Sequence, residues 1–309
     1  MAALDDLIRR RMHSEVALIR SIANYIIGGG GKRMRPVLVL LSAKACGYAG
    51  ARHLELAAVV EFIHTATLLH DDVVDESGLR RGRKTANAEF GNAASVLVGD
   101  FLYSRAFQMM VSAGNARVME VLADATNTIA EGEVLQLLNT HNAEVTEEEY
   151  LAVIHRKTAK LFEAAAQLGA ILGGVAPDVE KGLARYGMHL GTAFQLVDDV
   201  LDYSGDAAST GKNLGDDLNE GKPTLPLIHV LQSGLSEHVS TVRRAIEQGG
   251  RDAFPQVLAA INATGALTYA EDAARLEARL ARESIAILPQ SPCKDALVEL
   301  THFAVDRDH

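Results

Sequence analysis

The chain has 309 residues, of which 48% are hydrophobic, and its 30 Lys and Arg against 40 Asp and Glu give a net charge of −10. This hydrophobic fraction predicts a large buried core and excludes a disordered chain, while the acidic balance argues against general nucleic-acid binding. With two cysteines, no basic leader and no long apolar run, we expect a cytoplasmic protein without an integral membrane segment.

Helices are predicted along most of the chain. No proline occurs between Val37 and Ala176, a stretch rich in Ala, Leu and Glu, and this composition favours long helices. Aromatic residues make up 5% of the chain and alternating β-branched runs are scarce, which argues against a sheet. The predicted helices cover residues 36–48, 52–75, 92–113, 117–138, 147–172, 179–203, 223–232, 236–247, 254–263, 266–286 and 292–306. Because no Pro-, Ser- or Gly-rich linker divides the chain, we predict one all-α domain over residues 1–309.

A short acidic pattern occurs twice, each time near the end of a predicted helix. Asp-Asp-Val-Val-Asp at 71–75 is matched by Asp-Asp-Val-Leu-Asp at 198–202. The first and fifth aspartates of each copy share a helix face, although like charges at this spacing, and anions near a helix C-terminus, are destabilising. A solvated acidic face explains one such cluster, but both copies follow apolar residues, and carboxylates in that setting suit Mg²⁺ that binds substrate phosphates. The two helices therefore predict a diphosphate held between them by metal ions.

Basic clusters accompany both acidic motifs, as a bound diphosphate would require. Residues 28–36 read Gly-Gly-Gly-Gly-Lys-Arg-Met-Arg-Pro, residues 80–84 read Arg-Arg-Gly-Arg-Lys, and Lys212 and Lys222 follow the second motif. Each cluster alone is compatible with a solvated loop, but their placement favours anion binding. A P-loop nucleotidase is not expected, because Arg33 follows the first Gly-Lys pair and the second pair lacks the leading glycine of a Walker loop.

Glu61 and His64 form a Glu-x-x-His pair of the type found in helical di-iron proteins. Those proteins need two such pairs and two further glutamates around one site, and we interpret Glu61 and His64 without such a set, so a di-iron site is disfavoured. His64 shares a helical stripe with Asp71 and Asp75, which predicts that it faces the same site. A lone helical histidine is otherwise more often a core residue.

These motifs resemble those of the trans-type polyprenyl diphosphate synthases, in family order and over nearly the whole chain. The matching segments are residues 30–36, 70–82, 195–202 and 211–226. Residues 85–110 and 130–136 are especially similar to the bacterial octaprenyl-forming members of ubiquinone side-chain synthesis. The resemblance implies the all-α isoprenoid synthase fold, a bundle of long helices around a deep central cavity. It also implies a homodimer, for which the helix near 92–113 is the expected interface.

The activity implied by this resemblance is Mg²⁺-dependent transfer of isoprene units. Isopentenyl diphosphate would be condensed successively onto an allylic diphosphate, with farnesyl diphosphate as the expected primer and an all-trans octaprenyl chain as the expected product. Three Mg²⁺ ions per active site are implied, held by Asp71, Asp72, Asp75, Asp198, Asp199 and Asp202. The residues implied for isopentenyl diphosphate are Lys32, Arg35, His64 and Arg81. Those implied for the allylic diphosphate are Arg80, Lys157, Lys212 and Lys222.

The implied catalytic residues are Lys157, Thr158 and Gln195. Thr158 and Gln195 would lie near the reacting carbons, where neutral dipoles face a cation without capturing it. Without the resemblance, both would pass as ordinary polar residues on helices.

Product length depends on the residues one turn before the first acidic motif. Short-chain relatives carry an aromatic floor for the growing chain there, whereas this chain has the small Ala66 and Thr67, which predicts a longer product. Phe107 and Met110 are the candidate floor further along, although plain core packing explains either one equally well.

Several alternatives stay open. A solanesyl or decaprenyl diphosphate synthase would keep the mechanism and need a deeper floor. A terpene cyclase would replace the second acidic motif and have little use for Lys32, Arg35 and Arg81. An inert regulatory subunit would tend to lose acidic motifs that are both present here, and a purely structural bundle would leave them unexplained.

Overall fold

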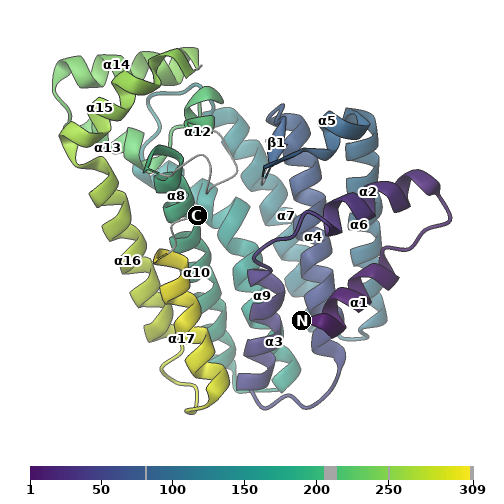
Figure 1. Ribbon diagram of the computed structural model, residues 1–309. Coiled ribbons are helices and arrows are strands. Elements are labelled where there is room, and N and C mark those ends of the chain that lie inside the picture. The colour runs from purple at the N-terminus through teal and green to yellow at the C-terminus, as the bar shows by residue number, and fades with distance from the viewer. Residues whose placement is uncertain (81, 205–213, 250, 307–309) are drawn as a thin grey trace. The chain divides into compact units, whose positions relative to one another are not determined.

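The structure is a computed structural model that describes residues 1–80, 82–204, 214–249 and 251–306 (Figure 1). Its helices are α1 (Ala2–Arg11), α2 (Ala17–Ile27), α3 (Met34–Ala45), α4 (Arg52–Val74), α5 (Ala86–Phe90), α6 (Asn92–Ser112), α7 (Ala116–Asn139), α8 (Glu147–Ile154), α9 (Lys160–Gly173), α10 (Pro177–Ser204), α12 (Asp216–Asn219), α13 (Leu225–Ser233), α14 (Ser236–Gln248), α15 (Phe254–Thr264), α16 (Ala266–Ser284) and α17 (Pro292–Val305). A π-helical turn, η1 (His155–Ala159), joins α8 to α9, and a 3₁₀ turn, η2 (Arg251–Ala253), precedes α15. Strands β1 (Leu79–Arg80) and β2 (Arg83–Lys84) form a short antiparallel hairpin.

The predicted all-α fold is confirmed, and every predicted helix is present with ends that differ by a few residues. The helix predicted over 147–172 is divided by the π turn η1. Helices α1, α2, α5 and α12 and the β1–β2 hairpin lie in segments for which no element is predicted.

Several helices begin at residues with a clear physical reason to start one. Thr146 precedes α8 and forms a capping box with Glu149: the Thr146 hydroxyl accepts the Glu149 N–H, and the Glu149 carboxylate accepts the Thr146 N–H. This arrangement satisfies two backbone donors that a helix start leaves open. Pro177 is the first residue of α10 and Pro226 lies in the first turn of α13, where a missing N–H costs nothing.

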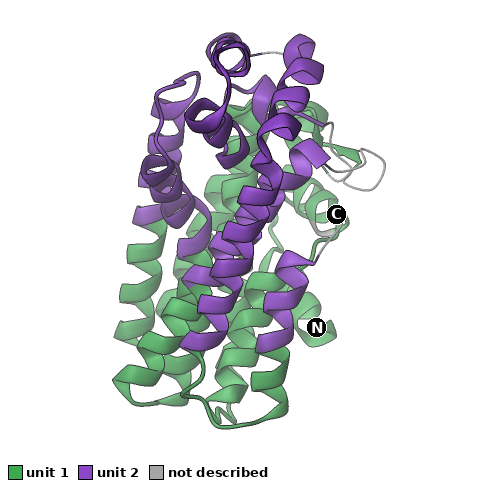
Figure 2. Ribbon diagram, turned by 90° about the vertical axis from the view of Figure 1, so that its left-hand side faces the viewer, with its two compact units in different colours: residues 1–126, 161–187, 285–297 green, residues 127–160, 188–284, 298–309 purple. Residues whose placement is uncertain are grey.

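The described residues form two compact units, coloured in Figure 2. Unit 1 contains the described residues of 1–126, 161–187 and 285–297, and unit 2 contains those of 127–160, 188–284 and 298–309. Helices α7, α9, α10 and α17 each contribute residues to both units. The prediction that residues 1–309 form one domain stays a prediction.

In unit 1 the central element is α4, which packs against α1, α3, α5 and α6. Every residue from Leu56 to Ile63 is buried, and a helix that is apolar on all sides is expected inside a core. Within this run lies one carboxylate, Glu61, which is 8% exposed. Helix α4 thus leads from the core of unit 1 to the first acidic motif, which lies at its C-terminal end.

In unit 2, α13 packs against α8, α14, α15 and α16. Buried alanines recur along one face of α16 at positions 266, 270, 274 and 278, so neighbouring helices can approach it closely. The core also contains Tyr203 of α10 and Leu218 of α12, which fixes the end of α10 and the short helix after it. Among the described residues, no helix combines the length and hydropathy needed to cross a membrane.

Candidate active site

The first acidic motif lies at the C-terminal end of α4. Asp71 is half-buried and Asp72 is buried, while Asp75 is the residue that caps the helix, with its N–H donating to the Asp71 backbone oxygen at 2.8 Å. Glu76 follows with a φ of 50°, a left-handed conformation that ends the helix. The predicted acidic helix end is therefore present, and the chain turns from it directly into the β1–β2 hairpin.

Arg80 on the hairpin returns to this motif and binds Asp72. Its Nε and Nη2 atoms both donate to Asp72 Oδ1, at 2.9 and 2.6 Å. Burial works to lower the pKa of the guanidinium, but the carboxylates of Asp72, Asp71 and Asp75 outweigh it, so the pKa of Arg80 is raised. The structure thus joins a predicted metal ligand, Asp72, to a predicted diphosphate ligand, Arg80. Asp72 is 4% exposed, and its contact with Arg80 fixes where the guanidinium lies.

A second group of basic residues is held by the same helix, two to three turns earlier. Arg33, at the start of α3, has a φ of 49° and pairs with the buried Glu61 carboxylate of α4. Arg35 donates from Nη1 to His64 Nε2 at 3.1 Å, and its guanidinium lies 4.3 Å from the centre of the Phe162 ring. The structure therefore brings Arg35 and His64 together, and it gives Glu61 an arginine partner. Lys32 is exposed in the loop before α3, and Arg81 lies outside the described residues.

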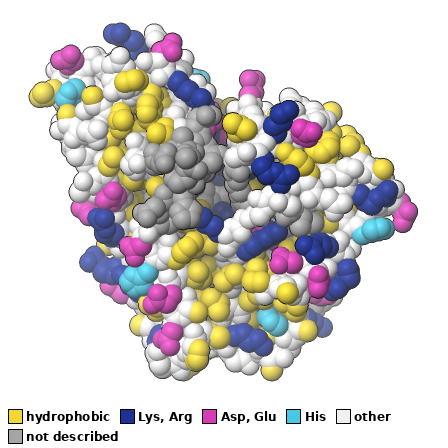
Figure 3. All heavy atoms as spheres, viewed as in Figure 1, with side chains coloured by type: hydrophobic (Ala, Val, Ile, Leu, Met, Phe, Trp, Pro, Cys, Tyr) yellow, Lys and Arg dark blue, Asp and Glu magenta, His cyan; other side chains and the backbone are white. Residues whose placement is uncertain are grey.

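A pocket of about 100 Å³ lies among these groups in unit 1. Apolar side chains, most of them from α1, α2 and α4, form part of its lining, and its polar lining consists of Tyr25, Arg33, Glu61, His64, Thr65, Asp72, Arg80, Arg83, Lys84 and Thr85. On the face drawn in Figure 3, several Lys and Arg side chains gather over the region of α2 and the hairpin. Four basic residues line the pocket against two acidic ones, and both acidic groups are paired with arginines, so its surroundings favour an anion.

The second acidic motif lies at the C-terminal end of α10, in unit 2. Asp202 accepts the backbone N–H groups of Asp216 and Asp217 on its two carboxylate oxygens, each at 3.2 Å. It thereby caps the N-terminus of α12 and fixes that helix to α10. Asp198 is half-buried, and Asp199 is 3% exposed.

Asp199 stands in a chain of hydrogen bonds that includes two of the predicted catalytic residues. Tyr150 donates its hydroxyl to Asp199 Oδ2 at 2.5 Å, and Gln195 Nε2 donates to Asp199 Oδ1 at 2.7 Å. Thr158 donates in turn to Gln195 Oε1 at 3.1 Å. These contacts fix the orientation of the Gln195 amide, because its oxygen and nitrogen have different partners.

The electrostatics around Asp199 fit a divalent cation. Burial, followed by repulsion from Asp217 and Asp198, raises the pKa of Asp199 to about 8, although its bonds to Tyr150 and Gln195 work in the opposite direction. The pKa of Tyr150 is raised well above its usual value by burial and by Asp199. A bound cation would relieve the repulsion between these carboxylates. Among the described residues, no three His, Cys, Asp or Glu side chains gather into a metal-binding cluster by themselves.

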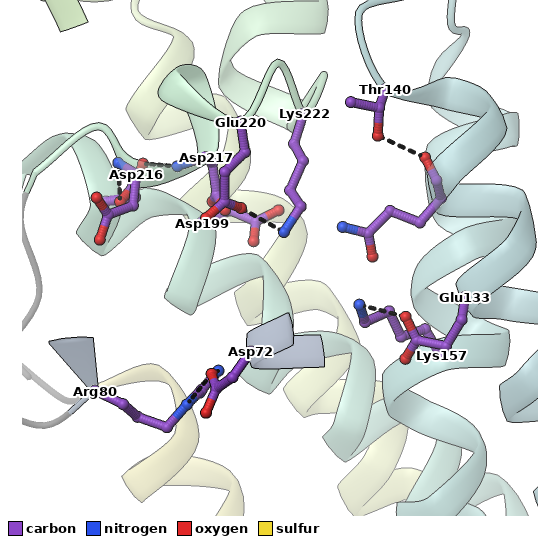
Figure 4. A network of polar contacts seen from close by, with 12 residues as sticks. Asp72, Arg80, Glu133, Thr140, Lys157, Asp199, Asp216, Asp217, Glu220 and Lys222 are labelled. Carbon is purple, nitrogen blue, oxygen red and sulfur yellow. Dashed lines mark hydrogen bonds and ion pairs between the residues drawn. The ribbon is translucent and has the colours of Figure 1, made fainter. Parts of the chain in front are cut away.

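Lys157 and Thr158 lie in the π turn η1, not in regular helix. The Lys157 ammonium is 2.6 Å from Glu133 Oε2, a contact drawn in Figure 4. On α7, Gly132 lies against this turn, and a Cβ there would come within 2.6 Å of the Lys157 backbone nitrogen. Single π turns inside α-helices are frequent at functional sites, and this one places two predicted catalytic residues where a regular helix would not.

Lys222 lies in the turn that follows α12. Its Nζ is 2.5 Å from Glu220 Oε2, and Figure 4 shows the side chain extending toward that carboxylate. Its N–H donates to the Asp217 backbone oxygen at 2.8 Å. The other predicted lysine of this region, Lys212, lies outside the described residues.

The predicted chain-length residues differ in burial. Ala66 is fully buried, and Thr67 is half-buried with its hydroxyl donating to the His64 backbone oxygen at 2.9 Å. Met110 is 1% exposed, whereas Phe107 is 39% exposed. Of the two floor candidates, Met110 is the one enclosed by the core.

Several residues that hold the predicted groups in place carry no clear signal in the sequence. Glu133 and Tyr150 are single polar residues on separate helices, so no local spacing marks them. Asp217 and Arg33 lie inside the motifs that carry the resemblance, and their acidic or basic neighbours are the signal that would have indicated them.

The sequence profile of the polyprenyl synthetase family matches residues 16–261. The octaprenyl diphosphate synthase of Escherichia coli strain K12 is 56% identical over 309 residues, which cover 100% of this chain and 96% of that relative. The all-trans-nonaprenyl-diphosphate synthase (geranyl-diphosphate specific) of Rhodobacter capsulatus is 49% identical over 307 residues, 99% of this chain and 94% of that relative. The crystal structure of polyprenyl synthase from Caulobacter crescentus CB15, complexed with calcium and isoprenyl diphosphate, matches with a TM-score of 0.97 at 44% identity, over 100% of this chain and 95% of that one.

Proposed function

The chain belongs to the polyprenyl synthetase family, and from this premise we propose that it makes octaprenyl diphosphate, with farnesyl diphosphate as the primer. It is a long-chain trans-polyprenyl diphosphate synthase, which condenses isopentenyl diphosphate onto an allylic diphosphate. The observation that carries the octaprenyl product is the 56% identity over the full chain to an octaprenyl diphosphate synthase, against 49% to the nonaprenyl enzyme. An apolar product of this kind suits the side chain of a quinone. We also propose that the enzyme is located in the cytoplasm.

The reaction needs charge to be stabilised on the leaving diphosphate. The allylic carbon–oxygen bond breaks, the isopentenyl double bond attacks the allylic carbon, and the proton then lost goes to the released diphosphate. Mg²⁺, when bound, neutralises the charge that develops on the diphosphate oxygens. We propose three ions, held by the aspartates of both motifs. Magnesium takes few protein carboxylates and fills its other positions with water and phosphate oxygens, so these aspartates need not form a complete ligand shell.

Basic residues of the chain would bind the two diphosphates directly. For isopentenyl diphosphate we propose Lys32, Arg35, His64 and Arg81. The contact between Arg35 and His64 supports this set. For the allylic diphosphate we propose Arg80, Lys157, Lys212 and Lys222. Their support is that Arg80, Lys157 and Lys222 are each held by a carboxylate in the part of the chain that the structure describes.

Thr158 and Gln195 would face the allylic cation. Neutral dipoles stabilise a cation without forming a covalent bond to it, and they serve best when their orientation is fixed in advance. The hydrogen bonds from Thr158 to Gln195 and from Gln195 to Asp199 support such a fixed orientation. Lys157 on the same π turn would bring a positive charge to the leaving diphosphate.

The proposed product is tested by one incubation. The purified protein is given Mg²⁺, farnesyl diphosphate and labelled isopentenyl diphosphate, and the dephosphorylated products are sized by mass spectrometry. A ladder ending at eight isoprene units is the expected result. A ladder ending at nine or ten units would keep the reaction and replace octaprenyl by solanesyl or decaprenyl, while no incorporation with any of several primers would indicate the inert subunit.

A further inference from the structure

His141, just after α7, is held in an unusual conformation that the proposed mechanism does not use. Its φ is 61°, which lies in the left-handed region that few residues other than glycine adopt. The backbone N–H of His141 donates to the Gly221 backbone oxygen at 2.8 Å. Its imidazole Nδ1 lies 2.9 Å from the Ile246 backbone oxygen, and because a carbonyl oxygen only accepts, Nδ1 is the donor in this contact.

The His141 ring fills the space above two glycines of other segments. Gly221 and Gly249 have φ values of 70° and 65°. A Cβ on Gly221 would lie 2.2 Å from His141 Nδ1, and a Cβ on Gly249 would lie 3.1 Å from its Cε1. His141 therefore joins three segments of unit 2: the end of α7, the turn after α12 and the end of α14.

The contacts between His141 and Gly221 help to fix the peptide group that joins Gly221 to Lys222. Its oxygen accepts the His141 N–H, and its N–H donates to the Asp217 backbone oxygen, both at 2.8 Å. Because a peptide group is planar, two partners on opposite edges define its orientation. That orientation sets the direction in which the Lys222 side chain leaves the backbone.

We propose that His141 is a positioning residue for Lys222, and that it presents the Lys222 ammonium to the allylic diphosphate. The inference rests on the proposed function, in which Lys222 binds that substrate. His141 does not touch the substrate, and its effect on the reaction passes through Lys222. Misplacing a binding group by about 1 Å costs up to about a hundredfold in rate, so the effect is measurable.

His141→Ala keeps the backbone N–H of His141 but removes the ring that packs on Gly221 and the Nδ1 bond that anchors this turn to Ile246, so it is the disruptive variant. His141→Asn is its matched control. The Asn side chain places an N–H donor where the His Nδ1 stands, and Asn tolerates a positive φ. We expect His141→Ala to raise the KM for farnesyl diphosphate by about tenfold or more, and to change the KM for isopentenyl diphosphate by less than about twofold. His141→Asn restores both values to near those of the unmodified chain. Thermal unfolding checks each variant, and His141→Gly, which has no strain at a positive φ, replaces His141→Ala if that variant does not fold.

A double-mutant cycle separates positioning from a general structural role. If His141 acts through Lys222, then His141→Ala adds little to Lys222→Ala, and the two effects on the KM for farnesyl diphosphate are not additive. Additive effects, or equal effects on the KM of both substrates, would overturn the inference while leaving the proposed function standing. If Lys222→Ala by itself leaves the KM for farnesyl diphosphate unchanged, then the proposed role of Lys222 fails, and the role of His141 fails with it.

Discussion

Asp199 is a residue whose burial opposes its charge. Its pKa in the folded chain is raised from 3.8 to about 8, first by burial and then by Asp217. The folded chain therefore keeps a proton that the unfolded chain releases. The contribution of this group to stability is fully present below about pH 4 and is lost as the pH rises through about 8. The ionised Asp199 carboxylate therefore destabilises the folded chain unless a cation binds beside it.

Asp199→Asn should remove this pH dependence. The amide is neutral at every pH and can keep the contacts with Tyr150 and Gln195. Without divalent cations, we expect the variant to unfold at a higher temperature than the unmodified chain near pH 8, with a difference that shrinks toward pH 5. Calorimetry or circular dichroism measures the transition, and Asp6→Asn, at a residue whose side chain is 64% exposed, is the control. A difference that does not vary with pH would contradict the account. Mg²⁺-dependent activity should be lost in the same variant.

Ala66 is the residue through which product length is most directly tested. Its side chain is fully buried and lies one turn before Asp71 on α4. Ala66→Tyr should end the growing chain at three or four isoprene units, because a ring there would act as a floor. Overpacking of this kind costs about 1–3 kcal/mol, so thermal unfolding is measured beside the products. Ala66→Ser is the control and should keep the long product, and an unchanged product ladder in Ala66→Tyr would reject Ala66 as a residue that lines the tunnel.

At the residue scale, the sequence predicts what is local in the chain. The aspartate pairs share a helix face by their spacing alone, and Gln195 lies one turn before Asp199 for the same reason. The partners Tyr150 and Glu133 come from other helices, and no spacing rule connects residues that meet only through tertiary packing. The pairing of Arg80 with Asp72 was equally hidden, because it depends on the hairpin that returns the chain to α4.

At the scale of elements, helix positions follow from glycine and proline punctuation. The helices over 92–112 and 266–284 were predicted within a few residues, since strong breakers or polar turns bound them. The π turn η1 was not predicted, because the apolar periodicity of 147–172 continues through it. Helix α7 approaches this turn closely at Gly132, a tertiary contact that no local periodicity predicts.

Gly132→Ala tests whether the π turn serves the reaction. The added Cβ would come within 2.6 Å of the Lys157 nitrogen, so the turn must shift and carry Lys157 and Thr158 with it. We expect the rate of isoprene transfer to fall by more than about tenfold, with the helix content unchanged. Steady-state kinetics and far-UV circular dichroism measure the two effects. Glu131→Ala, an exposed neighbour on the same helix, should leave the rate unaffected, and normal activity in Gly132→Ala would show that the shape of the turn does not matter.

At the scale of the whole molecule, we propose that the chain forms a homodimer through apolar residues that are exposed on α6. Leu97 is 66% exposed, Val111 is 61% exposed and Phe107 is 39% exposed. Exposed apolar side chains thus recur along this helix, which coincides with the predicted interface near 92–113, and apolar surface of this kind supports the proposed interface. The exposure of Phe107 also argues that it serves this surface more directly than a tunnel floor.

Leu97→Glu should therefore weaken the dimer. A charge placed within an apolar interface is left without water or a partner, and this is strongly unfavourable. We expect light scattering after size-exclusion chromatography to give the mass of two chains for the unmodified protein and of one chain for the variant. The control is Leu276→Glu on α16, where the native side chain is 42% exposed. This variant should stay dimeric. A single-chain mass for the unmodified protein would reject the proposed homodimer.

Both acidic motifs are proposed to hold the metal ions on which isoprene transfer depends. The most direct test measures Mg²⁺-dependent incorporation of labelled isopentenyl diphosphate by Asp71→Ala and by Asp198→Ala, one variant for each motif. Far-UV circular dichroism shows whether each variant is folded, and Asp6→Ala is the control. We predict that both variants lose turnover and keep the helix content of the unmodified chain. Near-normal incorporation by either folded variant would contradict the account, because one motif alone would then be enough.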